Sequence, residues 1–90
     1  MGTAAVKMKI MPDSPSVNLE EIKNEAIKII EKFGGKNVTF TEENIAFGLK
    51  AIIPFFAWDE KNDTETVEKA LQEIANISSV QTTDVRRAFG

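Results

Sequence analysis

The chain has 90 residues, of which 42% are hydrophobic and 28% charged, and its formal net charge is -3. These values are typical of one globular domain spanning residues 1–90, and they argue against intrinsic disorder. The acidic balance argues against a general binder of nucleic-acid backbones, because such proteins carry a basic face. The sequence has no His and no Cys, so the usual metal ligands, proton shuttles and thiol nucleophiles are missing.

The sequence predicts a cytoplasmic protein that does not associate with membranes. Residues 1–10 lack the apolar core of a signal peptide. The longest apolar-rich run, from Ala51 to Trp58, is far too short to cross a bilayer. A lack of cysteine is also compatible with a reducing compartment.

The first third of the chain predicts a strand followed by a helix. Residues 4–11 alternate in part between apolar side chains and lysines, which is the two-residue period of a half-buried strand. Asn18 is placed to cap a helix, with Glu21 as its capping-box partner, and Gly34-Gly35 supplies the left-handed stop. Between cap and stop, apolar residues recur at three- and four-residue spacing and give the helix one apolar face.

The middle of the chain predicts two strands. Val38 and Phe40 alternate with polar residues and begin the first of them, which continues irregularly to Ala46. Residues 49–58 form a second, more apolar strand. Because proline cannot donate a ladder hydrogen bond, we expect a bulge or a locally unpaired position at Pro54.

A second helix and a fourth strand complete the pattern. The helix begins near Asn62 or Asp63, with Glu65 completing a capping box from Asn62, and Asn76 is a suitable left-handed end. Residues 79–85 form the last strand. The order strand, helix, strand, strand, helix, strand predicts an α+β fold, the ferredoxin-like β-α-β-β-α-β sandwich, with a four-stranded antiparallel sheet and two helices on one face.

The third strand is apolar on both faces, so its orientation decides which side chains are exposed. In our favoured register Phe55 faces the helices, and the open face of the sheet carries Ile52, Phe56 and Trp58. An exposed apolar patch of this kind marks an interaction surface. In the alternative register these three side chains belong to the core and Phe55 points outward.

Carboxylate pairs make no convincing acid–base site in this sequence. Glu42 and Glu43 are adjacent in a strand, so their side chains point to opposite faces and cannot share a proton or a metal. Solvated carboxylates elsewhere are poor bases at neutral pH. The sequence therefore predicts a protein that acts by binding and is not an enzyme, with no metal and no cofactor.

The central segment from Asn44 to Lys50 is the best candidate for a binding feature, because Phe47 stands beside Gly48 in it. An aromatic side chain gives an interface a large contact area for little entropy lost. Glycine permits close backbone approach or an unusual turn. The alternative is that Phe47 is a core aromatic packed under a helix, since most large aromatics are largely buried.

The chain resembles the archaeal form of translation elongation factor 1-beta. The resemblance is carried by Ile45-Ala46-Phe47-Gly48-Leu49-Lys50 together with Asp84-Val85-Arg86-Arg87, and it covers nearly the whole chain. It implies a guanine-nucleotide exchange factor that promotes GDP release from elongation factor 1-alpha, and its reloading with GTP, during translation elongation.

The resemblance also implies which residues contact the GTPase. In the eukaryotic relatives an aromatic of the central motif inserts into a pocket of the GTPase, and Phe47 is the matching position. Those relatives also use a lysine at the extreme C-terminus, whereas Gly90 falls at about that position here, which leaves Arg86 or Arg87 to replace it. The implied contact residues are Ile45, Ala46, Phe47, Gly48, Lys50, Asp84, Arg86 and Arg87.

Two other functions are open to the same fold. One is a regulatory module that binds a small ligand at a subunit interface. The other is an RNA-binding module, which would stack bases on aromatic side chains of the third strand, although no basic residues flank the aromatics there.

Overall fold

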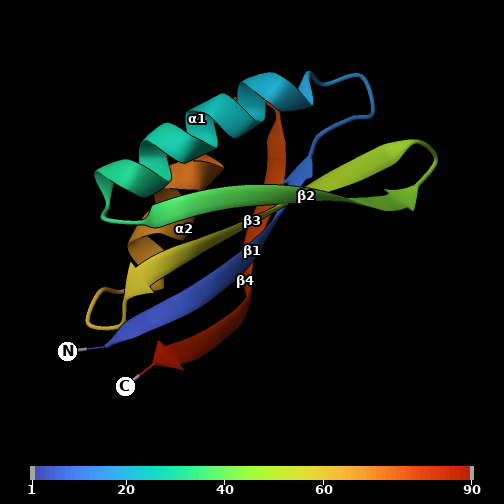
Figure 1. Cartoon of the computed structure of the whole chain (residues 1–90). Helices are drawn as coiled ribbons and strands as arrows, with labels where there is room; N and C mark the ends of the chain where they lie inside the picture. The colour runs from blue at the N-terminus through green and yellow to red at the C-terminus, as the bar shows by residue number, and fades with distance from the viewer. Residues whose placement is uncertain (1, 90) are drawn as a thin grey trace.

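Two helices cover one face of a four-stranded antiparallel sheet (Figure 1). The computed structural model describes the backbone of residues 2–89 and the side chains of residues 2–86. The predicted ferredoxin-like β-α-β-β-α-β sandwich is therefore confirmed. In chain order the elements are β1 (Thr3–Pro12), α1 (Leu19–Lys32), β2 (Lys36–Ala46), β3 (Leu49–Asp59), α2 (Thr64–Gln72) and β4 (Ile77–Phe89).

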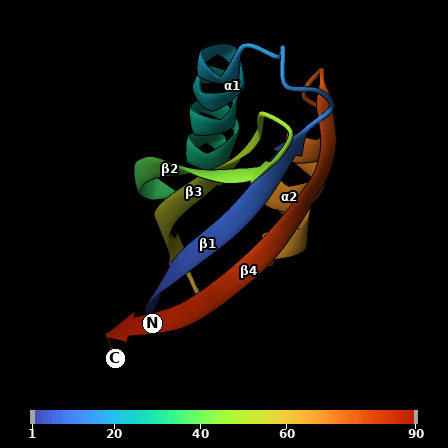
Figure 2. The same cartoon turned by 90° about the vertical axis from the view of Figure 1, so that its right-hand side faces the viewer.

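The strands lie in the order β2-β3-β1-β4, so β2 and β4 form the edges of the sheet. Each strand is antiparallel to its neighbours. Figure 2 shows both helices on one side of the twisted sheet, with no helix on the other side. The sheet therefore has a helix-covered face and an open face.

Helix α1 begins and ends where the sequence predicts. The side chain of Asn18 caps it by accepting a hydrogen bond from the Glu20 amide at 3.0 Å. Gly34 follows the helix with a φ of +106°, in the left-handed region that favours glycine. At Gly35 an added Cβ would clash with the Ile30 side chain, so the glycine allows the chain to turn tightly under the helix.

Helix α2 is capped by Asp63, not by Asn62. The Asp63 carboxylate accepts a hydrogen bond from the Glu65 amide at 2.9 Å, because Asp63 is the last extended residue before the helix. The predicted capping box from Asn62 is wrong; the backbone oxygen of Asn62 instead accepts a bond of 3.1 Å from the Trp58 indole. The predicted left-handed end at Asn76 is confirmed by its φ of +68°.

The core lies between the sheet and the helices, and β3 contributes its even-numbered residues to it. Phe56 and Trp58 are 1% and 2% exposed, and Phe55 is 46% exposed on the open face. Our favoured register for β3 is therefore wrong, and the alternative is confirmed. Large apolar residues occupy adjacent positions in β3, so only its pairing with β1 and β2 determines its orientation. The buried core cluster comprises Ala4, Val6, Met8, Ile10, Ile22, Ala26, Ile30, Ile52, Phe56, Trp58, Val67, Leu71 and Val80.

Pro54 interrupts one ladder without causing a bulge. The register between β1 and β3 is the same on both sides of it, with Lys7 opposite Phe55 and Ile10 opposite Ile52. No ladder pair is formed with β1 between these two, whereas the ladder to β2 continues through Pro54. Of the two expected alternatives, the locally unpaired position is confirmed and the bulge is wrong. Proline has no amide hydrogen to donate, so the ladder is interrupted on one side of β3 only.

Candidate functional site

The β2–β3 hairpin extends beyond the rest of the sheet (Figure 1). We call its outer part, residues 44–50, the finger. The finger is two-stranded, because Asn44 pairs with Lys50 while the ladder from β3 to β1 reaches only as far as Ile52. Every residue from 41 to 48 is exposed. A two-stranded hairpin alone is marginally stable in water, so the finger depends on contacts at its base.

Phe47 and Gly48 form the two-residue turn at the tip of the finger. Their φ angles are +53° and +81°. Positive φ at both positions is the pattern of a type I′ turn, whose preferred sequence is Asn-Gly. Glycine adopts this conformation freely, whereas a side chain in the left-handed region costs about 1–2 kcal/mol. Phe47 is therefore placed where the backbone disfavours it.

The Phe47 side chain is also 100% exposed. The alternative interpretation, in which Phe47 is a core aromatic, is wrong for this reason. A fully exposed ring does not contribute the stabilisation that a buried aromatic side chain gives to a folded chain. Neither backbone preference nor packing explains the choice of phenylalanine here. Backbone strain of this kind is concentrated at functional sites, which makes Phe47 the centre of the candidate site.

The residues beside Phe47 make the tip of the finger apolar. Ile45 is 37% exposed and lies at a register shift between Asn44 and Ala46. Gly48 lies close to the loop between β1 and α1, where a Cβ added to it would be 3.8 Å from the Cβ of Pro15. The tip therefore presents two exposed apolar side chains, Ile45 and Phe47.

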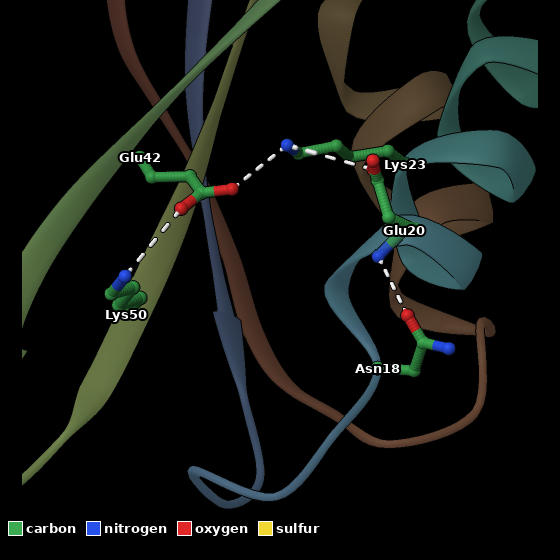
Figure 3. Close-up of polar contacts among 5 residues, drawn as sticks. All are labelled: Asn18, Glu20, Lys23, Glu42 and Lys50. Carbon is green, nitrogen blue, oxygen red and sulfur yellow. Dashed lines mark hydrogen bonds and ion pairs between the residues drawn. The ribbon is translucent and has the colours of Figure 1, made fainter.

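A network of charges joins the base of the finger to helix α1 (Figure 3). Lys23 of α1 donates a hydrogen bond of 2.8 Å to Oε2 of Glu42, whose Oε1 lies 3.9 Å from Nζ of Lys50. Glu20 lies on the other side of Lys23, at 3.8 Å. The hydrogen bond from Lys23 lowers the pKa of Glu42 below its usual 4.5. The same bond raises the pKa of Lys23 above its usual 10.5, so both groups are charged at neutral pH.

Glu43 makes its contact on the opposite face of the sheet. Its Oε1 lies 3.5 Å from Nζ of Lys9 in β1. Because β3 separates β1 from β2, this ion pair crosses β3, where Ala51 and Ile53 are 0% and 7% exposed on the open face. The prediction that Glu42 and Glu43 point to opposite faces agrees with their separate partners.

Sequence reasoning missed the two lysines that hold this acidic pair. Lys23 lies 19 residues before Glu42, and it reaches Glu42 only because α1 packs beside β2. Lys9 reaches Glu43 only through the strand order of the sheet. The signal in the sequence was the acidic dipeptide itself, at exposed positions of a strand.

The second group of candidate residues lies at the other end of the sheet. Arg86 pairs with Ala5, and Ala5 pairs with Ala57, which is nine residues along β3 from Gly48. Nine residues of strand span roughly 30 Å. Arg86 is also paired with Asp84 at 2.8 Å. The structure therefore does not bring Asp84 and Arg86 together with the finger, and the Arg87 side chain and Gly90 lie outside the described residues.

The open face of the sheet provides little for base stacking. Phe56 and Trp58 are buried in edge-to-face contact, with ring centroids 5.6 Å apart. Phe55 remains exposed, with Lys7 opposite it in β1. RNA-recognition sheets stack two or three bases on exposed aromatics, so the one exposed ring among the described side chains of this face is a poor platform.

Features for ligands, metals or membranes are sparse among the described residues. No group of three His, Cys, Asp or Glu side chains gathers there to hold a metal ion. No helix in the described part of the chain is long and apolar enough to cross a membrane. A hollow of about 330 Å³ lies between α1 and the chain after α2, lined by Val17, Asn18, Glu21, Ile22, Glu25, Glu73, Ile74, Ala75 and Asn76.

Comparison with known proteins connects this geometry to a family. The sequence pattern of the EF-1 guanine nucleotide exchange domain matches residues 5–88. The chain belongs to this family. Elongation factor 1-beta of Methanosarcina barkeri is 39% identical over 88 residues, which cover 97% of this chain and 99% of that protein. Elongation factor 1-beta of Methanocaldococcus jannaschii is also 39% identical, over 98% of this chain and 100% of its own length.

The resemblance to archaeal elongation factor 1-beta is therefore confirmed. A third relative, elongation factor 1-beta of Methanobrevibacter smithii, is 40% identical over 97% of this chain and 98% of its own length. The family and the names of these relatives support a nucleotide-exchange role in translation elongation. In members of the EF-1 exchange family such a role is one of binding.

Proposed function

We propose that this protein promotes GDP release from elongation factor 1-alpha, and its reloading with GTP, during translation elongation. The observation that carries the proposal is Phe47, which is fully exposed at a strained position on the tip of the finger. Family membership supplies the kind of partner. Phe47 is then the apolar anchor that enters a pocket of the GTPase.

The proposed mechanism is a linkage between two binding equilibria. A translational GTPase holds phosphate through backbone amides, a lysine and magnesium. If the protein binds the nucleotide-free GTPase best, it lowers the affinity of the GTPase for nucleotide. Bound nucleotide lowers the affinity of the GTPase for the protein by the same factor. An aromatic anchor supplies binding energy for this without covalent chemistry, because buried aromatics dominate interface energetics. The protein would therefore act by contact, as a single exchange domain. It would do so in the cytoplasm, and it would need no metal, cofactor, nucleic acid or membrane.

The remaining candidate residues divide into two proposed contacts. In the finger, Ile45, Ala46, Gly48 and Lys50 would surround the anchor. At the other end of the sheet, Asp84, Arg86 and Arg87 would form a separate contact, roughly 30 Å away by strand length. An arginine there is suited to a charge on the GTPase, because its planar fork binds carboxylate or phosphate in a bidentate way.

Release of a fluorescent GDP from elongation factor 1-alpha tests the proposal directly. The wild-type protein should accelerate release, and Phe47→Ala should slow the stimulated rate by about tenfold or more, the effect of removing an interface hot spot. Phe55→Ala is the matched control, because it removes a second exposed phenylalanine from the same hairpin. Its stimulated rate should stay near wild type.

Two results would overturn this proposal. If the wild-type protein does not accelerate release, the assigned partner is wrong. If Phe47→Ala accelerates release as well as wild type while it remains folded, Phe47 is not the anchor. A chain truncated to residues 1–85 belongs in the same assay, because full stimulation by it would remove the terminal arginines from the proposal.

A further inference from the structure

We propose that Glu42 and Glu43 are positioning residues that clamp the base of the finger from both faces of the sheet. Glu42 is held by Lys23 on the helix-covered face, and Glu43 is held by Lys9 on the open face. The clamp fixes the direction of the finger and so the place of Phe47. This inference rests on the proposed function, because the clamp would position Phe47, which makes the proposed contact with the GTPase.

The helix side of the clamp is anchored in the core. Lys23 follows Ile22, which is 3% exposed beneath α1, so the backbone that carries the lysine is fixed. The Lys23 side chain is only 20% exposed and lies between the carboxylates of Glu20 and Glu42. Glu42 in turn contacts Lys50 of β3, so its carboxylate connects α1 to both strands of the hairpin.

The open side of the clamp is anchored in the sheet. Lys9 belongs to β1, which pairs with β3 on one side and β4 on the other. Its side chain crosses β3 to reach Glu43 at 3.5 Å. Glu43 pairs with Ala51 of β3, over which this ion pair passes. The Glu43 carboxylate is therefore tied to the centre of the sheet.

The position of the two carboxylates explains why they occur together. Glu42 pairs with Ile52, and Ile52 is the last residue at this end of β3 that also pairs with β1. Glu43 pairs with Ala51, which lies next to the finger. The hairpin leaves the sheet there, so bending of the finger would take place at this point. Bending towards the open face lengthens the Lys23–Glu42 contact, and bending towards the helices lengthens the Lys9–Glu43 contact.

A clamped finger and a free finger differ in what binding requires. A free finger must lose conformational entropy when it docks, which lowers affinity. Once it is docked, Phe47 still occupies its pocket, so the maximal rate of GDP release is unchanged. Loss of the clamp should therefore raise the concentration of factor that gives half-maximal release, whereas loss of Phe47 should lower release even at high factor concentrations.

The test compares Glu42→Gln, Glu43→Gln and the double variant in the GDP-release assay. Each single change should raise the half-maximal concentration about two- to threefold, and the double change about fivefold or more, within the range that exposed ion pairs supply. The maximal rate should remain at the wild-type value. Glu25→Gln is the matched control, because it removes the same charge from the surface. The ion pair of Glu25 is with Lys28, within α1, and not with the hairpin.

A second measurement needs no GTPase and separates this inference from the proposed function. Backbone 15N relaxation should show larger motion of amides 44–50 in the double variant than in wild type, with residues of β1 unchanged. Lys23→Arg should keep the wild-type behaviour, because arginine can hold the same carboxylates. If the wild-type protein fails to stimulate release, the proposed function is wrong and the relaxation data alone judge the clamp. The clamp would be overturned by unchanged motion of amides 44–50 in the double variant. It would also be overturned if the double variant and Glu25→Gln had the same half-maximal concentration.

Discussion

The sheet body and the finger differ in how well each residue suits its place. In the body, Phe56 is 1% exposed in a strand that favours aromatics. In the finger, Phe47 is fully exposed in a turn that favours asparagine. Natural sequences are locally consistent except where function requires otherwise. The contrast between these two phenylalanines therefore separates the residues that fold the chain from the residue that it presents.

The largest expected effect lies in the body. Phe56→Ala should lower the free energy of unfolding by about 3–5 kcal/mol, because it removes a buried ring and leaves a cavity. Phe55→Ala, one residue earlier, should lower it by less than about 1 kcal/mol, since Phe55 is half exposed. Urea unfolding of both variants measures the difference. Equal losses would show that the two faces of β3 are not distinguished as the structure has them.

The smallest expected effect lies in the clamp and depends on pH. The pKa of Glu42 is lowered in the folded state by the hydrogen bond from Lys23, so its contribution is complete above its unfolded pKa and is lost as pH falls through its folded pKa. The pKa of Lys23 is raised, chiefly by its hydrogen bond to Glu42, so its contribution is lost only as pH rises through a value above 10.5.

The stability difference between wild type and Glu42→Gln should therefore be constant between about pH 6 and 9 and should shrink below pH 4.5, the usual pKa of the group. Urea unfolding at a series of pH values measures it. The charges that face Glu42 are Lys23, Lys50 and, beyond Lys23, Glu20. A difference that does not shrink as pH falls below 4.5 would contradict an ionic clamp, because the clamp requires the ionised carboxylate.

Local signals made the fold predictable from the sequence. The cap at Asn18, the stop at Gly34 and the left-handed Asn76 each depend on a few adjacent residues, and all three are confirmed. The orientation of β3 was not predictable, because Phe55 and Phe56 are equally apolar neighbours. The orientation of β3 also depends on its pairing with β1, and β1 is distant from β3 in the sequence.

The candidate site was predictable only in part for the same reason. The motif around Phe47 was found, but not the type I′ turn that strains it. The sequence names Arg86 and Phe47 as contact residues but does not give their separation, because the antiparallel register that puts Arg86 at the far end of the sheet joins distant segments of the chain. The Lys23–Glu42 contact joins residues 19 positions apart, and no local pattern indicates it.

Phe47→Asn measures whether Phe47 serves the partner or the fold. Asparagine is preferred at this turn position and tolerates a positive φ, so the free energy of unfolding should rise by about 0.5–1 kcal/mol and the melting temperature by a few degrees. The stimulated rate of GDP release from elongation factor 1-alpha should fall by about tenfold or more, because the apolar anchor is lost. Higher stability with slower release is the predicted result. A variant that is less stable than wild type, or one that releases GDP as fast as wild type, would contradict the assignment of Phe47 as the anchor.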